Sequence, residues 1–192
     1  MALKIMLALA GVVLIALGAQ RYFASFMAQS PTAYAGTKPA FDPRVHLAGP
    51  MVSEGVIFGP TGHVSSRFVA DMNGTWSNSG GVLSEVFSFD ESGEPLRREW
   101  NITDTGPNQF VATASDVVGE AVGVYEGSAL QMKYRLRLSE SAGGHVLNVT
   151  DWLYLAPNGH ILNKSEMRKF GIKVAELVAT IRPGAPNFSP AE

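Results

Sequence analysis

The sequence predicts an all-β protein: an antiparallel up-and-down barrel of roughly nine or ten strands, preceded by an N-terminal apolar helix. Apolar and polar residues alternate with a period of two in many segments, as in residues 64–76. Turn-forming residues separate these segments at intervals of roughly 8–12 residues. No convincing helical pattern follows the N-terminal segment. An up-and-down barrel is the most economical arrangement, because closure removes the exposed edges of the sheet.

The predicted strands differ in how clearly they alternate. In residues 64–76, Phe68, Met72 and Trp76 share one face, and Arg67 lies on the other. Residues 130–138 have the cleanest alternation, whereas residues 146–155 are apolar on both faces. In chain order the predicted strands are 52–58, 64–76, 82–90, 96–103, 109–116, 120–126, 130–138, 146–155, 161–170 and 172–181.

The first 28 residues form a membrane anchor or a signal segment. Residues 3–19 are apolar except for Lys4, and an aromatic stretch with Arg21 follows them. Aromatic residues and arginine at the end of an apolar helix are typical of an interfacial anchor. A charged start, an apolar run and the small residues Ala16 and Gly18 are also typical of a cleaved secretory signal. Both interpretations remain open.

The rest of the chain divides into three parts. Residues 29–43 are rich in Pro, Ala, Gly and Thr and predict a linker. Residues 44–183 contain the alternating segments and predict the β-barrel domain. Residues 184–192 predict a disordered tail. A barrel part of about 150 residues is long enough to bury a sizeable core.

Composition excludes several classes of function. The net charge of -2 gives no basic surface for nucleic acid, so we expect no nucleic-acid partner. The absence of cysteine excludes disulfides, thiolate metal sites, a cysteine nucleophile and a lipidated N-terminal cysteine. The four histidines have no metal-ligand spacing. Phosphate-binding, dinucleotide-binding and hydrolase motifs are also missing, so we predict no cofactor, no metal site and no catalytic residue.

Several motifs resemble a bacterial envelope family, the family of domains of unknown function numbered 3833. The resemblance covers most of residues 41–181. The motifs are Arg67-Phe68 with Gly74-Thr75-Trp76, Arg98-Glu99-Trp100, Asp116-Val117-Val118-Gly119-Glu120-Ala121 with Gly123, Asp151-Trp152, and Ser165-Glu166-Met167-Arg168-Lys169-Phe170-Gly171. The resemblance implies an envelope-associated barrel similar to the lipocalins, and it brings no established activity. Gly74-Thr75-Trp76 also resembles the Gly-x-Trp of lipocalins, whose Trp closes one barrel end.

This resemblance and the N-terminal segment together predict a location. We expect the protein to be held in the bacterial inner membrane by residues 3–19, with the barrel on the periplasmic side. If the segment is cleaved, the protein is secreted to the periplasm. Lys133, Arg135 and Arg137 form a basic stripe along one strand face. Such a stripe is either a solvated face or a contact with anionic lipid head groups.

Charged residues on apolar strand faces predict a buried ionic cluster. Glu85 shares a face with Leu83 and Phe87, and Arg98 shares one with Trp100. A charge on an apolar face is costly unless it is paired, so we expect a Glu85–Arg98 pair. Further candidates for this cluster are Arg67, Asp116, Glu120, Asp151 and Arg168. The cluster has three interpretations: an ionic network at a barrel end, a site for the polar head of a lipid-like ligand, or an acid–base pair.

Aromatic and small residues decide whether the barrel is filled or hollow. Trp76, Trp100 and Trp152 lie on alternating strands, as does Tyr134, and they either fill the core or line a cavity. Inward-facing small residues would leave a void; the candidates are Ala112, Ala114, Ala121 and Gly123.

We therefore predict a membrane-tethered, lipocalin-like protein that binds a lipid or a fatty-acid-like ligand. The alternatives are a lipid-modifying enzyme that uses a barrel carboxylate such as Glu85 or Asp116, and a structural or partner-binding envelope protein. The first alternative requires a titrating carboxylate open to the cavity, and the second requires a filled barrel. The sequence predicts no oligomeric state.

Overall fold

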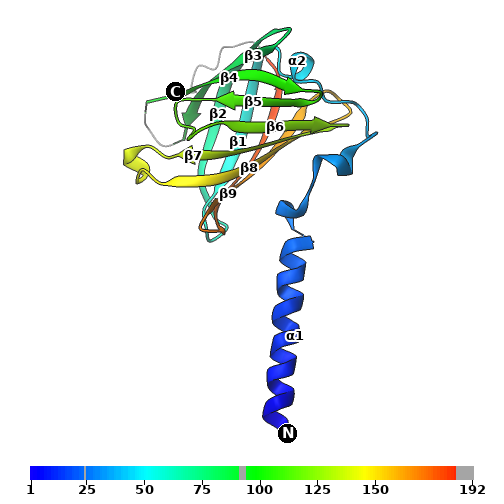
Figure 1. Cartoon of the computed structure of the whole chain (residues 1–192). Helices are drawn as coiled ribbons and strands as arrows, with labels where there is room; N and C mark the ends of the chain where they lie inside the picture. Colours follow the sequence, from blue (N-terminus) through cyan, green and yellow to red (C-terminus); the bar gives the residue numbers. More distant parts are fainter. Residues whose placement is uncertain (24, 91–93, 185–192) are drawn as a thin grey trace.

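Ten antiparallel strands form a closed barrel in the computed structural model, which describes residues 1–23, 25–90 and 94–184 (Figure 1). Each strand pairs with the next in the chain, and β1 also pairs with β10, so the predicted up-and-down barrel is confirmed. The strands are β1 (Gly49–Phe58), β2 (Val64–Ser77), β3 (Gly80–Phe89), β4 (Leu96–Gly106), β5 (Gln109–Thr113), β6 (Ala121–Glu126), β7 (Ala129–Arg137), β8 (Val146–Leu155), β9 (Ile161–Lys169) and β10 (Ile172–Pro183).

The strand bounds differ from the predicted ones by one to three residues at about half of the ends. β1 begins three residues before the predicted strand, because Gly49 pairs with Gly74 on β2. β5 ends at Thr113 instead of residue 116, since the chain turns there and Val117 bridges to Leu136 on β7. Residues 185–192, most of the predicted tail, lie outside the described residues.

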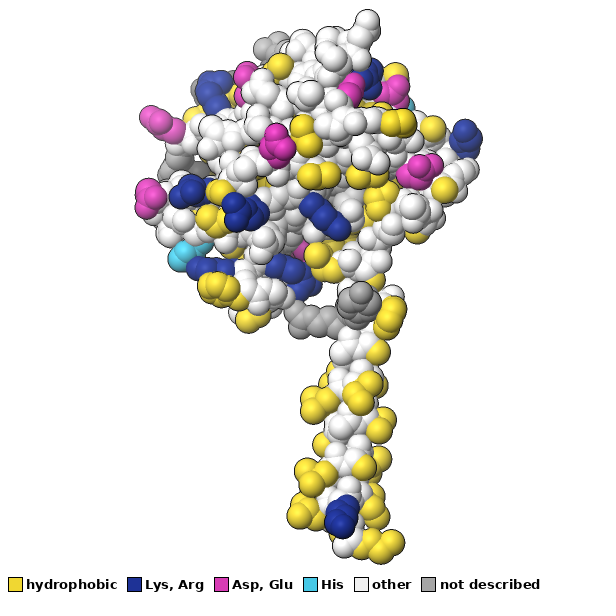
Figure 2. Space-filling model, in the orientation of Figure 1, with side chains coloured by type: hydrophobic (Ala, Val, Ile, Leu, Met, Phe, Trp, Pro, Cys, Tyr) yellow, Lys and Arg dark blue, Asp and Glu magenta, His cyan; other side chains and the backbone are white. Residues whose placement is uncertain are grey.

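Helical segments are short except at the N-terminus. They are α1 (Ala2–Phe23), η1 (Phe26–Ala28), η2 (Pro31–Tyr34), α2 (Pro43–His46) and η3 (Glu140–Ala142). Residues 2–20 of α1 have a mean hydropathy of 2.4 and are entirely unburied, so this helix is long and apolar enough to cross a membrane. Figure 2 shows apolar side chains along the whole length of α1. The helix is compatible with an anchor and with a signal sequence.

The linker packs against the outside of the barrel at Tyr34, whereas Phe41 near its end is buried in the core. The Tyr34 ring lies 5.4 Å from Trp152 and 5.7 Å from Tyr154, measured between ring centroids. Trp152 and Tyr154 alternate outward on β8, and their rings stack on each other with an interplanar angle of 2°. The linker therefore buries a patch of aromatic side chains on the outer wall.

The short helix α2 caps one end of the barrel, which we call the α2 end. Asp42 is the N-cap of α2, and its carboxylate accepts a hydrogen bond from the Arg44 backbone N–H at 2.9 Å. The indole Nε1 of Trp76 donates to the Leu47 carbonyl at 2.9 Å. Pro43 and Leu47 are buried against the barrel interior. The expectation that Trp76 closes one barrel end agrees with this geometry.

Gly74 on β2 makes this close approach possible. A Cβ atom at position 74 would collide with the backbone carbonyl oxygen of Leu47. Since backbone atoms cannot move aside as a flexible side chain does, only glycine lets the chain pass this close.

We predict that Gly74→Ala destabilises the barrel by about 1–3 kcal/mol, the usual cost of overpacking. Gly106→Ala is the matched control, because Gly106 also lies in a strand and a Cβ there meets no atom within 4 Å. Urea denaturation of both variants measures the difference. Equal stabilities would show that the contact between α2 and β2 is not tight.

Candidate functional site

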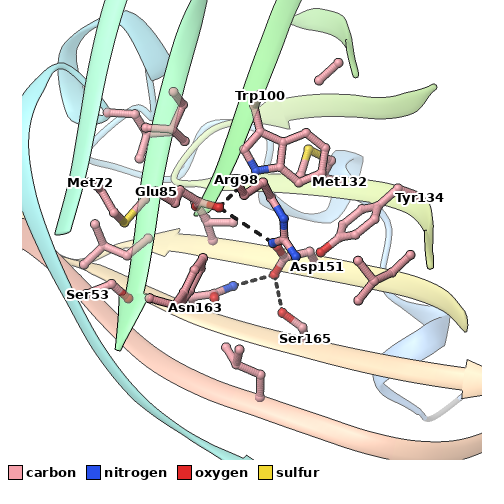
Figure 3. A pocket seen from close by; sticks show the side chains of 18 of the residues that line it. Ser53, Met72, Glu85, Arg98, Trp100, Met132, Tyr134, Asp151, Asn163 and Ser165 are labelled. Carbon is pink, nitrogen blue, oxygen red and sulfur yellow. Dashed lines mark hydrogen bonds and ion pairs between the residues drawn. The ribbon is translucent and has the colours of Figure 1, made fainter. Parts of the chain in front are cut away.

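The barrel encloses a cavity of about 260 Å³ (Figure 3). Inward-facing side chains from every strand except β6 line it, and most of them are apolar. The polar and charged lining residues are few: Ser53, Glu85, Arg98, Tyr134, Asp151, Asn163 and Ser165. The barrel is therefore hollow, with a polar group set among apolar walls.

The two ends of the cavity are different. At the α2 end, Pro43 and Leu47 close it, and both are buried. At the other end the lining includes Leu96, the first residue of β4, which is 42 % exposed. The cavity therefore approaches the surface at the end opposite α2.

The small residues contribute to the cavity unequally. Ala112 lines it, as predicted, and is buried. Gly123 leaves no void, because the ring of Phe110 occupies the space where its side chain would be. The two residues pair directly across β5 and β6, so the large ring fills the gap beside the glycine. The prediction that Gly123 opens a void is wrong.

Glu85 and Arg98 form the predicted ion pair. The register of β3 and β4 places them opposite each other, and Nη1 of Arg98 lies 3.7 Å from Oε2 of Glu85. Trp100, two residues further on β4, donates its indole N–H to the same oxygen at 3.2 Å. The guanidinium carbon of Arg98 lies over the Phe87 and Trp100 rings, at 5.7 and 5.6 Å from their centroids.

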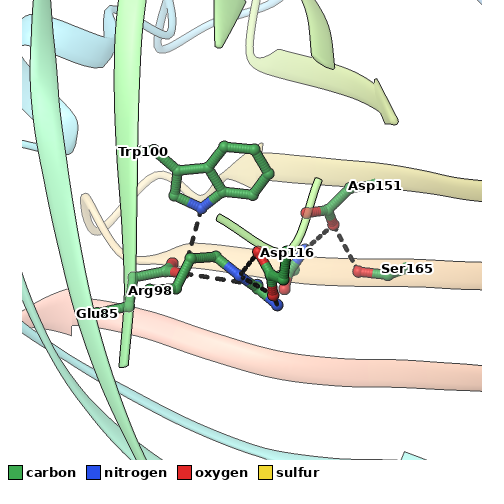
Figure 4. Close-up of polar contacts among 7 residues, drawn as sticks. Glu85, Arg98, Trp100, Asp116, Asp151 and Ser165 are labelled. Atoms are coloured by element: carbon green, nitrogen blue, oxygen red, sulfur yellow. Dashed lines mark hydrogen bonds and ion pairs between the residues drawn. The ribbon is translucent and has the colours of Figure 1, made fainter. Parts of the chain in front are cut away.

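Asp116 completes the ionic cluster from a different segment (Figure 4). Its carboxylate accepts two hydrogen bonds from Arg98, from Nε at 2.9 Å and from Nη2 at 2.7 Å. Asp116 lies in the connection after β5, and its carbonyl accepts from the Arg137 backbone N–H at 2.7 Å. This backbone contact fixes the carboxylate next to the guanidinium.

Asp151 faces the cavity from β8, across from Ser165 on β9. Ser165 donates its hydroxyl to Oδ1 of Asp151 at 2.6 Å, and the side-chain amide of Asn163 donates to the same oxygen. Tyr134 on β7 packs edge-on against Trp100, with ring centroids 5.2 Å apart. Figure 3 shows these side chains gathered at the middle of the cavity.

Burial changes the acidity of the two cavity carboxyls. It raises the pKa of Glu85 to about 7, against the opposing effects of the Arg98 charge and the Trp100 hydrogen bond. Burial likewise raises the pKa of Asp151, although Ser165 and Asn163 favour its charged form. Near neutral pH the cavity therefore contains a carboxyl that takes up and releases a proton.

The raised pKa of Glu85 predicts a pH-dependent stability. Between the ordinary value of 4.5 and about 7, the folded protein holds a proton on Glu85 that the unfolded chain has lost. The free energy of unfolding therefore falls as pH rises through this window, by about 3 kcal/mol for this one group. Glu85→Gln removes this contribution. Urea denaturation of both proteins at several pH values measures it, and parallel pH profiles would contradict it.

The structure divides the predicted site residues into two groups. Trp76, Glu85, Arg98, Trp100, Tyr134 and Asp151 line the cavity, and Asp116 contacts it through Arg98. Arg67, Glu120, Trp152 and Arg168 do not line it. The prediction that Arg67, Glu120 and Arg168 join one cluster with Glu85 and Arg98 is therefore corrected, and so is the prediction that Trp152 lies in the binding site.

Each of the four excluded residues has a different place. Arg67 points outward from β2, is 71 % exposed and pairs with Asp90. Arg168 points outward from β9 and binds Glu166 at 2.6 Å. Trp152 is buried under Tyr34 on the outer wall, and Glu120 is exposed before β6. Strand parity excludes Arg67, Trp152 and Arg168, since each alternates with an inward-facing neighbour.

Sequence reasoning missed Ser53, Asn163 and Ser165. Asn163 and Ser165 share the inward face of β9 with Ile161 and Met167, so strict alternation was the available signal. Because polar residues occur on both faces of β9, the alternation did not show which face is inward.

A family model matches residues 21–183, and its description is "Protein of unknown function (DUF3833)". The chain belongs to this family. The comparison with curated proteins returned no match. The DUF3833 family therefore brings a fold and a set of motifs, but no activity.

Solved structures resemble the DUF3833 barrel at low identity. The S-type phycobiliprotein lyase CPES from Guillardia theta matches with a TM-score of 0.54 and 8 % identity, over 74 % of this chain and 90 % of that one. Rv2717c from M. tuberculosis matches with a TM-score of 0.50 and 14 % identity, over 78 % of this chain and 99 % of that one. At such identities the likeness concerns the fold alone, a lipocalin-like barrel.

Proposed function

We propose that this protein is a membrane-tethered, lipocalin-like binding protein for a lipid or a fatty-acid-like molecule. The observation that carries the proposal is the hollow barrel, with mostly apolar walls and a small polar cluster at its middle. Pockets for small molecules have this composition, in which apolar walls bury the ligand and a few polar groups orient it. Barrels of this kind are able to hold one small ligand. The Guillardia lyase, by its name, acts on a pigment-bearing protein, and it has a similar barrel.

Helix α1 supports the tether. We propose that it stays uncleaved in the bacterial inner membrane, with the barrel on the periplasmic side. Its apolar residues are exposed, and burying them in a bilayer removes that surface from water. If the helix is instead removed as a signal, the barrel is released into the periplasm.

The β9–β10 hairpin supports a second contact with the membrane. Phe170 at its tip is 90 % exposed and has a positive φ of 51°, while Ile172 is 65 % exposed. A large aromatic side chain in that backbone region is unfavourable and contributes no burial. Lys169 and Lys173 flank the tip, and aromatic and basic residues together suit an anionic bilayer surface.

Two views of the structure support an orientation in which the tip of the β9–β10 hairpin faces the same membrane that holds α1. Figure 1 shows the β1–β2 and β9–β10 hairpins pointing toward the side from which α1 leaves the barrel. Figure 2 shows Lys and Arg side chains gathered on the part of the barrel nearest α1. Lys133, Arg135 and Arg137 are exposed on the outer face of β7 and carry the same sign of charge.

We predict that the hairpin tip enters the bilayer surface. The native chain has no cysteine, so Phe170→Cys gives a single site for a fluorescent label in the full chain, reconstituted in nanodiscs with nitroxide-labelled anionic lipids. The label at position 170 should be quenched. A label at Asn158→Cys, in the turn at the α2 end, is the matched control and should not be. Leu9→Cys reports on insertion of α1, so an unquenched position 9 contradicts the tether itself.

We also predict that filling the cavity abolishes ligand binding. Ala112→Phe places a ring in the cavity, whereas Val111→Phe places one on the outer face of the same strand. Native mass spectrometry of the full chain, purified gently from its host, should find a co-purifying lipid with the native protein and with Val111→Phe. The amount of lipid that co-purifies with Ala112→Phe should be at least tenfold lower, which corresponds to about 1.4 kcal/mol in affinity. A native chain without ligand would contradict the proposal.

A lipid-modifying enzyme is the second candidate, favoured by the raised pKa of Glu85 within the cavity. A carboxyl that titrates near neutral pH is suited to acid–base catalysis. If the protein is an enzyme, added lipid should be recovered chemically changed. The Glu85→Gln variant should then bind the lipid but leave it unchanged. The binding protein predicts that the lipid is recovered unchanged.

A further inference from the structure

The polar cluster in the cavity contains more acid than base. Glu85 and Asp151 line the cavity with Arg98, and Asp116 pairs with Arg98 at its edge. Among the described residues in this cluster, three carboxyl groups therefore meet a single guanidinium. A ligand that enters the cavity meets this balance of charge out of reach of most solvent screening.

Arg98 is already engaged by the protein's own carboxylates. Asp116 accepts from its Nε and Nη2 groups, at 2.9 and 2.7 Å. Its Nη1 group faces Glu85 at 3.7 Å. A fatty-acid carboxylate usually binds an arginine whose donors are free and whose charge is not compensated. Arg98 is not such an arginine, because Asp116 and Glu85 already face it.

In their ionised form the carboxyl oxygens instead offer acceptors, and for Glu85 this form predominates above its pKa of about 7. Asn163 and Ser165 both donate to Oδ1 of Asp151, and neither of them donates to Oδ2. Glu85 accepts from Trp100 through Oε2, and no side chain donates to its Oε1 among the hydrogen bonds of the described residues. Both side chains face the cavity, as Figure 3 shows.

We propose that the cavity selects an amphipathic ligand whose polar group donates hydrogen bonds and carries no negative charge, such as an alcohol, an amide or an amine. This inference rests on the proposed function and narrows its ligand class. A bound carboxylate would bring a further negative group against Glu85 and Asp151, which is costly at low dielectric. A donor group on the ligand is able to donate to Oε1 of Glu85 and Oδ2 of Asp151, to which none of the side chains described above donates.

A metal ion does not explain the same residues. No group of three or more His, Asp or Glu side chains in the described part of the chain is arranged to hold one. The cluster is distributed over β3, β4, β8 and the connection after β5, with Arg98 between its carboxylates.

The test compares ligands that differ only in their polar group. The full chain in nanodiscs is incubated at pH 7.5 with an equimolar mixture of dodecanoic acid, dodecan-1-ol, dodecanamide and dodecylamine, and complexes are identified by native mass spectrometry. Ala112→Phe in the same nanodiscs gives the background from ligand dissolved in the lipid. After this correction, the alcohol, amide and amine together should exceed the acid at least tenfold.

A pair of variants tests the part played by Arg98. Asp116→Asn removes one of the charges that neutralise the guanidinium, so the share of dodecanoic acid should rise about tenfold. Asp90→Asn is the matched control, because it also releases an arginine, Arg67, but outside the cavity. That control should keep the ligand preference of the native protein. An unchanged preference in Asp116→Asn overturns the inference.

The outcomes separate this inference from the proposed function. If dodecanoic acid binds the native protein best, the selectivity is overturned while the lipid-binding function is supported. If no compound binds above the Ala112→Phe background, the proposed function itself is contradicted, and the inference with it.

Discussion

The pairing of β1 with β10 is the constraint on which the rest of the structure depends. Eight residue pairs, from Met51 with Pro183 to Phe58 with Glu176, join the first strand to the last. Without this ladder the sheet would have two open edges, with unpaired backbone groups along both. Closure also turns one face of every strand into an enclosed interior. The β1–β10 pairing therefore helps to remove inward-facing side chains from bulk water, including those on strands far from it in sequence.

Enclosure explains why the charged residues of the interior are arranged as they are. Glu85 and Arg98 are inward-facing neighbours on β3 and β4, so neither has solvent to stabilise its charge. Asp116 accepts from Arg98 and Trp100 donates to Glu85, in place of water. Asn163 and Ser165 donate in the same way to the third buried charge, Asp151. Buried ion pairs contribute little net stability, since desolvation offsets their attraction. An apolar core would stabilise the barrel as well, so stability alone does not explain the cluster.

The two ends of the barrel have different roles because the chain treats them differently. At the α2 end, Gly74 lets the segment after α2 pass over the strands, and Trp76 holds that segment by its carbonyl. The linker continues over the outer wall and covers Trp152. The opposite end has the exposed Leu96 on the cavity lining and the apolar tip of the β9–β10 hairpin. One end is closed by packing, and at the other the cavity approaches the surface.

The sequence by itself determined the barrel, most strand positions and the Glu85–Arg98 pair. Alternation with a period of two and regularly spaced turns depend on local residue choice, and adjacent strands of a hairpin meet in a register that the turn sets. The apolar α1 helix was equally clear, because length and composition alone define it. Only the tertiary structure decided which charged residues share the cavity. It excluded Arg67, Glu120, Trp152 and Arg168, brought in Asn163 and Ser165, and filled the space beside Gly123 with Phe110. Strand parity, a local pattern, already separates Arg67, Trp152 and Arg168 from Asn163 and Ser165. The place of Asp116 beside Arg98 and of the Phe110 ring beside Gly123 depends instead on contacts between separate segments, which no local pattern of residues encodes.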